Sequence, residues 1–239
     1  MKKHHLPQQE HKNELKGAAF IPALNQNFLT PLYDFMMKWA ARESTFKPKL
    51  VEQARIEKGQ RVLDLGCDTA TLSILIKKTN PEAEVVGLDA DPKILDIAKS
   101  KARSADVQIT LDYGMSFDLP YLDKSFDRVV ASMLFHHLSP EDKIRTLKEV
   151  YRILKTEGEL HIADFGRPHN ALMKLSSYVM RHLEQTSDLM NDVLRNMLLN
   201  VGFEQVEETA KFMTVFGTFT LYRAMKPKSE VKGLQGWKK

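Results

Sequence analysis

Two aspartates, Asp64 and Asp89, each lie at the end of a short apolar run with the composition of a buried strand. The chain turns at Gly66 and continues with helical spacing, so a helix N-terminus, which tolerates anions, is expected to face this turn. The aspartates stand 25 residues apart (89 − 64 = 25), close to the spacing at which a carboxylate binds a ribose diol. The pattern predicts a site for a nucleoside cofactor, with Asp89 as the ribose ligand.

A second set of reactive groups follows later apolar runs. His136 and His137 come after the run that ends at Ala131, and Asp164 ends the next run. The carboxyl ends of strands border the ligand crevice in open α/β sheets, and histidine is the commonest general base. Either histidine could accept a proton there, or the pair could cap or orient a loop. His161 lies inside a predicted strand and is expected to be a packed core residue.

No metal site is expected. The spacing of these histidines and aspartates matches no zinc signature. Cys67 is the single cysteine, which excludes an internal disulfide and a cysteine-rich metal site.

The elements that must position these groups follow from hydrophobic spacing. Strand-like runs alternate with stretches of helical spacing, and this alternation predicts a doubly wound parallel sheet. Asp91-Pro92 and Ser139-Pro140 each combine an oxygen cap with a proline of the first turn, so two helices are expected to begin there. Strands are predicted near 61–65, 84–88, 107–111, 127–131 and 159–163, helices near 69–78, 92–103 and 140–154, and two final strands at 203–209 and 213–223.

Helical segments are also predicted outside the sheet. An N-terminal helical region at 31–41 and 47–54 carries an apolar face. Residues 169–201 have a helical pattern rich in methionine, a flexible and polarizable residue that suits an adaptable apolar pocket. This segment is interpreted as a helical lid over the substrate or as a segment packed against the sheet. Its methionines are Met173, Met180, Met190 and Met197.

Several motifs occur in the order found in one known family. The stretches RVLDLGCDTATLS at 61–73 and VVGLDADP at 85–92, followed by segments 114–120, 125–131, 133–138 and 150–160, resemble the class I S-adenosylmethionine-dependent methyltransferases. The pattern is most similar to the ubiquinone and menaquinone biosynthesis type. Two departures stand out. Asp68 and Ala70 occupy the second and third glycine positions of the family's D-x-G-x-G-x-G turn, and 156–158 reads Thr-Glu-Gly where Pro-Gly-Gly is common.

The resemblance implies a fold, a cofactor and a set of site residues. The implied fold is a Rossmann-like, doubly wound seven-stranded α/β sheet, mostly parallel with an antiparallel C-terminal strand pair, N-terminal helices and a helical lid. The implied cofactor is S-adenosyl-L-methionine. The cofactor-binding residues would be Asp64, Gly66, Cys67, Asp89, Ala90, Gly114, Met115, Ser132 and Tyr33, the catalytic residues His136 and His137, and the substrate contacts Asp164, Met173 and Met180.

The function that the resemblance implies is methyl transfer to a small, apolar or aromatic molecule. The alternative is a non-catalytic binding or scaffold protein that retains the fold with a degenerate glycine turn. A nicotinamide dehydrogenase is disfavoured because G-x-G-x-x-G is absent and no second catalytic domain follows. The expected organisation is a flexible segment at 1–29, a methyltransferase domain at 30–225 with its lid at 169–201, and a basic tail at 226–239.

The positive charge of the chain lies in its ends. The formal net charge is +4; residues 1–16 contribute +2 (four Lys, two Glu) and residues 225–239 contribute +4 (five Lys, one Glu), which leaves 4 − 6 = −2 for 17–224. A body without positive excess is a poor surface for counterion release, so no nucleic-acid partner is expected. No apolar run approaches the roughly 20 residues of a membrane span, and the polar start lacks a secretory signal. The expectation is a cytoplasmic monomer or homodimer without stable membrane insertion.

Overall fold

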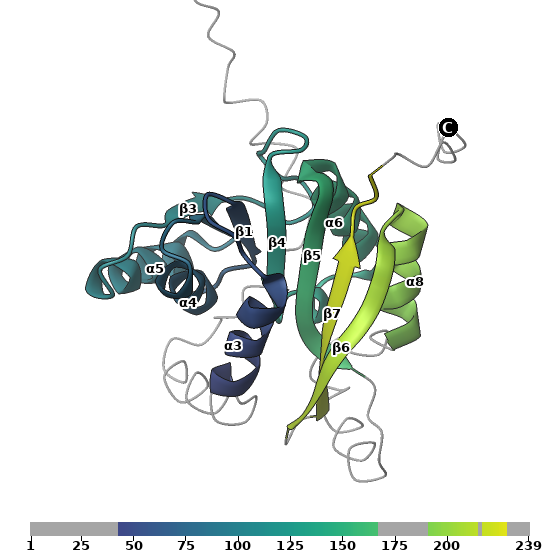
Figure 1. The fold of residues 1–239 in the computed structure, drawn as a ribbon. Coiled ribbons are helices and arrows are strands. Elements are labelled where there is room, and N and C mark those ends of the chain that lie inside the picture. Colours follow the sequence, from purple (N-terminus) through teal and green to yellow (C-terminus); the bar gives the residue numbers. More distant parts are fainter. Residues whose placement is uncertain (1–42, 167–190, 215–216, 229–239) are drawn as a thin grey trace, which may run out of the picture. The chain divides into compact units, whose positions relative to one another are not determined.

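A seven-stranded sheet in the order β3-β2-β1-β4-β5-β7-β6 forms the centre of the fold (Figure 1). The computed structural model describes residues 43–166, 191–214 and 217–228, which belong to the unit formed by 35–239. The strands are β1 (Arg61–Leu65), β2 (Glu84–Asp89), β3 (Thr110–Tyr113), β4 (Phe126–Ser132), β5 (Leu154–Gly166), β6 (Glu204–Thr214) and β7 (Gly217–Met225). The helices are α3 (Glu43–Ala54), α4 (Thr71–Thr79), α5 (Pro92–Ser104), the short 3₁₀ helix η2 (Phe135–His137), α6 (Pro140–Ile153) and α8 (Asn191–Val201).

The direction of the strands confirms the predicted fold class. Strands β1 to β5 pair in parallel, whereas β7 runs antiparallel to both of its neighbours, β5 and β6. The strand order reverses between β1 and β4, which pair directly. In open α/β sheets the ligand crevice lies outside the carboxyl ends of the strands at such a reversal. The segments that follow β1, β2 and β4 are therefore expected to border a ligand crevice.

Two predicted helix starts are confirmed. The Asp91 carboxylate accepts a hydrogen bond from the backbone N–H of Lys93 at 2.8 Å, and Pro92 opens α5. The Ser139 hydroxyl accepts one from the N–H of Asp142 at 3.1 Å ahead of α6. Both caps satisfy a backbone donor that has no partner inside the helix.

The third strand begins three residues later than predicted. The sequence indicated 107–111, but the strand is Thr110–Tyr113. Asp106 has a φ of 53° and the N–H of Val107 donates to the carbonyl of Ala102 at 3.2 Å, so these residues close the end of α5. Pairing with β2 starts only at Thr110, opposite Val86.

The fifth strand is longer than the predicted 159–163 because it includes an irregular segment. Leu154 pairs with Phe126, and the register then shifts before Glu159 pairs with Arg128. Within this bulge Glu157 has a φ of 62°. A Cβ atom on Gly158 would lie 2.8 Å from the Lys155 carbonyl oxygen. The segment with Thr-Glu-Gly in place of Pro-Gly-Gly therefore joins α6 to the sheet through a turn in which a glycine is required.

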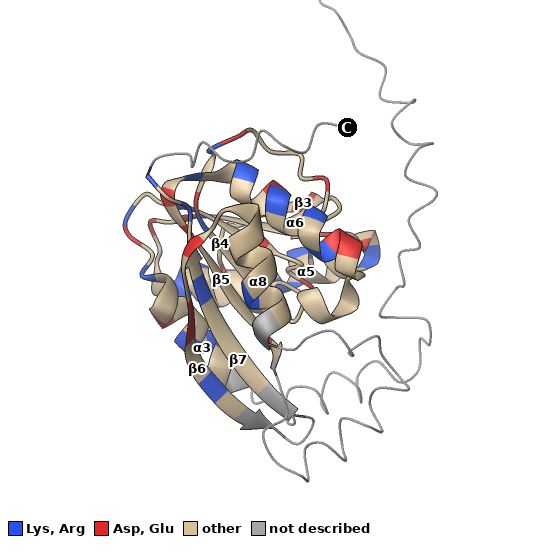
Figure 2. Cartoon of the chain, turned by 90° about the vertical axis from the view of Figure 1, so that its right-hand side faces the viewer, with Lys and Arg blue, Asp and Glu red and all other residues tan. Residues whose placement is uncertain are grey.

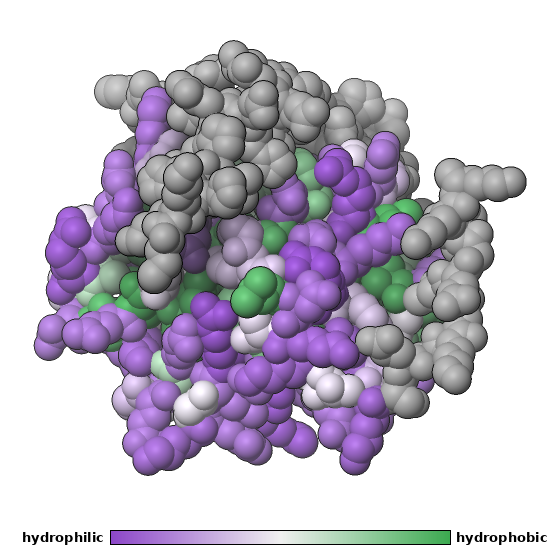
Figure 3. Space-filling view, turned by 90° about the horizontal axis from the view of Figure 1, so that it is seen from above, coloured by the Kyte–Doolittle hydropathy of each residue, from purple (hydrophilic) through white to green (hydrophobic). Residues whose placement is uncertain are grey.

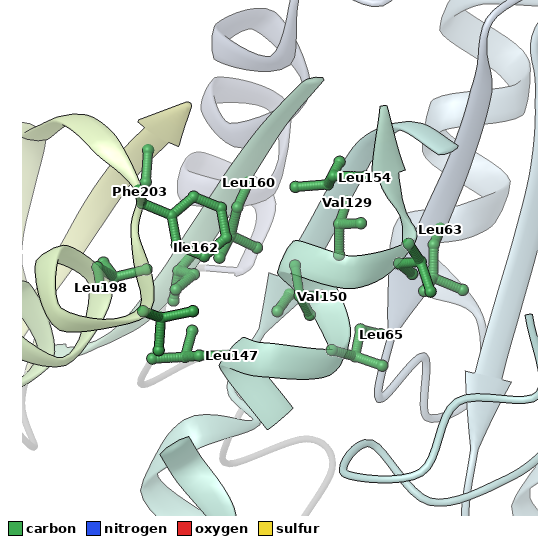
Figure 4. Packing of buried hydrophobic residues seen from close by; sticks show 14 of the residues in the cluster. Leu63, Leu65, Val129, Leu147, Val150, Leu154, Leu160, Ile162, Leu198 and Phe203 are labelled. Atoms are coloured by element: carbon green, nitrogen blue, oxygen red, sulfur yellow. The ribbon is translucent and has the colours of Figure 1, made fainter. Parts of the chain in front are cut away.

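The sheet is covered by helices on both faces. On one face α6 and α8 pack over the central strands, and Figure 4 shows side chains of these helices against β1, β4 and β5. On the other face α3 and α4 pack over β1, β2 and β7, and α5 packs beside α4. The labelled residues of Figure 4 are Leu63, Leu65, Val129, Leu147, Val150, Leu154, Leu160, Ile162, Leu198 and Phe203.

Some of the helices predicted outside the sheet lie within the described residues. The helix predicted at 47–54 is α3, and its buried Phe46 stacks on Phe219 of β7 at 4.9 Å between ring centroids. Within the predicted lid, α8 is described, and its Met197 is partly buried against the core. The predicted helix at 31–41 and the residues Tyr33, Met173, Met180 and Met190 lie outside the described residues.

The surface of the described part is mainly polar. Seen from above, hydrophilic residues surround small separate hydrophobic areas (Figure 3). The large apolar side chains that are exposed come from several elements: Ile97, Tyr113, Leu122, Ile144, Val193 and Leu199. Within 43–166, 191–214 and 217–228, no helix combines the length and apolar character needed to cross a bilayer.

Candidate functional site

The turn after β1 has an alternating left-handed backbone. Gly66, Asp68 and Ala70 have φ angles of 71°, 48° and 59°. A Cβ atom on Gly66 would lie 2.9 Å from Cδ1 of Leu134, so close packing as well as backbone conformation favours glycine there. Asp68 and Ala70 thus adopt the conformation that glycine would adopt at the same positions. The turn keeps the shape of a glycine-rich loop although two of its residues carry side chains.

Asp89 connects the end of β2 to this turn. Its Oδ2 accepts a hydrogen bond from the N–H of Asp68 at 2.9 Å, and its Oδ1 accepts one from the N–H of Asp91 at 3.0 Å. Burial raises the pKa of Asp89, and these backbone donors oppose that rise. Each carboxylate oxygen can accept a further hydrogen bond. Asp89 is therefore held in place by backbone groups while it retains capacity for a diol.

Asp64 supports the turn from inside the core. Its side chain is buried, and its Oδ2 accepts a 2.5 Å hydrogen bond from the hydroxyl of Ser73 on α4. Burial raises the pKa of Asp64 to about 6, although the Ser73 hydroxyl lowers it in part. Ser73 is a site residue that the sequence reasoning missed. The available signal was a serine on the buried face of the helix that follows the turn.

Cys67 lies between the two strands that carry the aspartates. It is buried, and a Cβ atom on Gly87 of β2 would approach its sulfur to 3.0 Å. Burial raises the pKa of this thiol strongly, and the carboxylates of Asp64, Asp89 and Asp68 add to the effect. Cys67 is therefore a neutral packing residue in an environment of negative potential.

The loop after β3, which holds two of the predicted cofactor-binding residues, lies at the same edge of the sheet. The N–H of Gly114 donates to the carbonyl of Asp89 at 3.1 Å, which places the loop after β3 against the end of β2. Met115 forms an isolated bridge with Asp118 in this loop. Ala90 follows Asp89 directly. The structure thus brings Asp89, Ala90, Gly114 and Met115 together.

Ser132, at the end of β4, carries a hydroxyl that is buried and has no hydrogen-bond partner among the described residues. The next residue, Met133, has a φ of 59° and donates its N–H to the carbonyl of Ala163. Leaving a buried hydroxyl unpaired costs about 1–3 kcal/mol. Ser132 is therefore a group that a bound ligand could satisfy at the point where the strand order reverses.

His136 and Asp164 form a buried pair. Nδ1 of His136 lies 2.9 Å from Oδ1 of Asp164, and both side chains are almost completely inaccessible, at 3% and 0%. Oδ2 of Asp164 accepts a hydrogen bond from the N–H of Phe135 at 2.8 Å. Asp164 therefore holds η2 through two contacts, one with the backbone N–H of Phe135 and one with the ring of His136. Its predicted contact with a substrate stays a prediction.

His137 and His161 have different surroundings. The ring of His137 packs on that of His136 at 3.9 Å between centroids, and His137 is exposed. Partial desolvation of the imidazole lowers the pKa of His137, and the neighbouring His136 lowers it further. His161 has no exposed surface and contacts Gln53 and Glu159, as expected of a packed core residue.

Two surface hollows among the described residues lie away from the aspartates. One of about 400 Å³ opens at the amino ends of β2 and β3, the edge opposite the aspartates. In the part of the chain that the structure describes, no three or more His, Cys, Asp or Glu side chains are grouped so as to hold a metal ion. The lining residues of the hollow are Lys77, Glu82, Ala83, Glu84, Val85, Gln108, Ile109 and Thr110.

The sheet order and the aspartate-linked turn define a Rossmann-like nucleoside-binding domain of the methyltransferase type. A family model described as a methyltransferase domain matches residues 62–158. This match, the relatives named below and the fold together support a class I S-adenosylmethionine-dependent methyltransferase.

Curated relatives are similar over different lengths of the chain. A demethylmenaquinone methyltransferase of Lactobacillus johnsonii is 34% identical over 152 residues, which cover 62% of each protein. The chain thus spans less than two thirds of that relative. A demethylmenaquinone methyltransferase of Deinococcus radiodurans is 28% identical over 207 residues, covering 82% of this chain and 84% of the relative. The fold is also that of a SAM-dependent methyltransferase from Methanosarcina mazei, with a TM-score of 0.64, 19% identity, and coverage of 75% of this chain and 98% of that one.

The residues present fit S-adenosylmethionine, the cofactor that the match to a methyltransferase domain implies. The turn has the left-handed φ angles of a glycine-rich loop, Asp89 has acceptor capacity for ribose hydroxyls, and the Ser132 hydroxyl has no partner among the described residues. The fields of three carboxylates reach Cys67, and such a region favours a ligand that carries a sulfonium and an ammonium group. Among the implied cofactor residues, only Tyr33 lies outside the described ranges.

Proposed function

We propose that the protein transfers a methyl group from S-adenosylmethionine to a small molecule with a quinone-type aromatic ring. The observation that carries this proposal is the Asp89 carboxylate, which links the end of β2 to a left-handed turn after β1. The relatives support a quinone-type acceptor, because the proteins from Lactobacillus johnsonii and Deinococcus radiodurans are both named demethylmenaquinone methyltransferases.

The proposed binding residues come from the carboxyl ends of four strands, β1 to β4. Asp89 accepts hydrogen bonds from the ribose hydroxyls, and the loop with Gly114 and Met115 borders the adenine. The turn at Gly66 and Cys67 presents its backbone to the amino-acid part, and Ser132 contributes its unpaired hydroxyl. When bound, the sulfonium supplies a methyl group that is already activated, so the protein mainly has to hold the acceptor in line and exclude water.

The catalytic residues belong to the segment after β4. His136 and His137 follow the strand that adjoins β1 at the reversal of strand order. An acceptor that loses a proton needs a base, and histidine suits this role. The contacts of Asp164, Met173 and Met180 with the acceptor, the cytoplasmic location, and the monomeric or homodimeric state are predictions from the sequence.

The test is calorimetric titration with S-adenosylmethionine and S-adenosylhomocysteine. Wild-type protein should bind both, and Asp89→Ala should weaken binding by about 1–3 kcal/mol because the ribose hydrogen bonds are lost. The matched control is Glu84→Ala, at the opposite end of the same strand, where the carboxylate pairs with Arg61 at the surface. This control should bind like wild type. Absence of binding by the wild type would refute the proposal and favour a scaffold protein.

A further inference from the structure

Each hydrogen-bond partner that the Asp164 carboxylate has among the described residues is a donor. Oδ1 lies 2.7 Å from the N–H of Phe165 and 2.9 Å from Nδ1 of His136. Oδ2 lies 2.8 Å from the N–H of Phe135. Burial alone would raise the pKa of Asp164, but His136 and these backbone donors outweigh it, so the pKa lies below its usual range. The side chain is therefore an ionised acceptor.

An ionised acceptor fixes the protonation of its partner ring. Since Asp164 has no proton to donate, Nδ1 of His136 must carry the hydrogen of this contact. In a neutral imidazole the other nitrogen, Nε2, is then an acceptor. The ring is held in orientation by the edge of Phe165, at 5.0 Å between centroids, and by the ring of His137.

A second histidine pair in the same strand shows the contrast. Both ring nitrogens of His161 are engaged, Nδ1 with Gln53 at 3.0 Å and Nε2 with Glu159 at 3.1 Å. Of the two ring nitrogens of His136, only Nδ1 has a hydrogen-bond partner among the described residues. Both ring nitrogens of His161 thus have hydrogen-bond partners. The Nε2 atom of His136 has none within the described ranges.

We propose that Asp164 is a positioning residue that holds His136 with Nδ1 protonated and Nε2 ready to accept a proton, so that the site takes a methyl acceptor that loses a proton as it is methylated. The chemical class is a hydroxyaromatic ring such as a hydroquinone, which reacts at oxygen or at an adjacent ring carbon. This inference rests on the proposed function. It selects His136 over His137 because, of these two rings, only that of His136 has a hydrogen bond to a carboxylate among the described residues.

The step balances without a further reagent. The acceptor forms a bond to the methyl carbon, the bond between that carbon and sulfur breaks, and its electron pair stays on sulfur. The proton of the acceptor's O–H or C–H passes to Nε2 of His136. Asp164 stabilises the resulting imidazolium through the Nδ1 hydrogen bond and keeps its own charge.

The first experiment reads the tautomer directly. Nitrogen NMR of the full chain with ¹⁵N-labelled histidine, without ligands, should show Nε2 of His136 in the range of an unprotonated imidazole nitrogen and Nδ1 in that of a protonated one. Asp164→Asn should disturb these two signals, and His161→Gln, the matched control from the other pair, should leave them in place. A protonated Nε2 in the neutral wild-type ring would overturn the inference whether or not the cofactor binds.

The second experiment measures transfer from S-adenosylmethionine to a short-chain demethylmenaquinone that has been reduced to its hydroquinone. His136→Gln and Asp164→Asn should each lower kcat by about 100-fold or more, with the affinity for S-adenosylmethionine and the KM for the hydroquinone unchanged. His161→Gln should keep the wild-type kcat. If Asp164→Asn does not fold, the kcat of His136→Gln and the tautomer of the wild-type ring still test the inference.

The outcomes separate the inference from the function it rests on. Wild-type transfer that persists in His136→Gln or in folded Asp164→Asn refutes the inference and leaves the proposed function intact. Cofactor binding without transfer to the hydroquinone refutes the acceptor class. Failure of the wild type to bind S-adenosylmethionine refutes the proposed function, which the titration with Asp89→Ala reveals independently.

Discussion

At the scale of single residues, the turn after β1 shows how a backbone shape can outlast the residue type that favours it. Asp68 and Ala70 have the positive φ angles that glycine adopts without steric cost. For Ala70, burial of its methyl group between α4 and α5 offsets part of that cost. Asp68 is exposed, so burial of its side chain does not offset the cost in this way. The strain at the two positions is therefore unequal.

The first prediction concerns this strain. Asp68→Gly should raise the free energy of unfolding by about 0.5 kcal/mol, because glycine relieves the left-handed conformation but adds freedom to the unfolded chain. Urea denaturation measures the change. Asp68→Ala is the matched control, since it removes the carboxylate and keeps the Cβ atom, and it should not stabilise. Equal stabilisation by both variants would assign the effect to repulsion among the carboxylates instead.

A second prediction follows from the pKa of Asp64. Its folded value of about 6 lies above the value of about 3.9 expected in the unfolded chain. The contribution of Asp64 to stability is therefore complete below pH 4 and is lost as the pH rises through 6. Between pH 4 and 7 the wild type should lose about 2 kcal/mol relative to Asp64→Asn, which does not titrate. Urea denaturation at several pH values tests this, and parallel profiles for the two proteins would contradict it.

The sequence identified the parts of the site that local pattern encodes. The apolar runs and the turn at Gly66 predicted where Asp64 and Asp89 lie, and the structure joins the turn to Asp89. It did not reveal that Ser73 bonds Asp64 or that Asp164 bonds His136, because these contacts depend on how a helix and a loop pack on the sheet. Partners 9 and 28 residues apart leave no periodic signal.

At the scale of elements, the sequence predicted the type of each described strand and α-helix correctly but placed some of their bounds less accurately. The helix starts at Asp91 and Ser139 followed from capping chemistry that is local to the sequence. The bounds of β3 and β5 differed because a strand begins where a neighbour can pair with it. Thr110 is the first residue of β3 opposite β2, and Leu154 reaches Phe126 across the register shift. Such limits are properties of pairs of strands.

The turn that enters β5 gives a third prediction. Gly158→Ala should destabilise the protein by about 2 kcal/mol, because its Cβ atom would meet two backbone oxygens, those of Lys155 at 2.8 Å and Asp127 at 3.1 Å. Gly59→Ala provides the comparison, since that Cβ atom would enter open space and only the φ of 75° is unfavourable, at about 1 kcal/mol. Thermal denaturation of the two variants measures the difference. A smaller loss for Gly158→Ala than for Gly59→Ala would show that the turn can adjust.

At the scale of the whole molecule, charge and burial are distributed differently. Figure 2 shows positively and negatively charged residues interspersed along the ribbon of α6, in keeping with the net charge of −2 obtained for 17–224. The absence of a nucleic-acid partner is still a prediction. Burial, by contrast, is concentrated: nearly all of β1 is buried, whereas β3 at the sheet edge has exposed residues at both ends.

This gradient leads to a fourth prediction. In native-state hydrogen exchange, amides of β1 and of Val129–Ala131 in β4 should exchange only through global unfolding, because both strands are paired on each side and covered by helices. Amides of β3 should exchange through a smaller opening. Measuring exchange against low urea concentrations distinguishes the two classes. A common exchange free energy for β1 and β3 would mean that the sheet opens as one unit.

The position of β7 has a consequence for synthesis on the ribosome. A chain is made from its N-terminus onward, yet β7 lies between β5 and β6, both of which precede it. Until Gly217–Met225 emerges, the β5 backbone has an open edge and β6 has no neighbour in the sheet. Strands β1 and β2, which carry Asp64 and Asp89, and η2, which carries His136, are complete before that time. The nascent protein thus passes through a stage with its site-bearing strands present and an unprotected edge, and translation of β7 ends the interval in which β5 can pair with a strand of another chain.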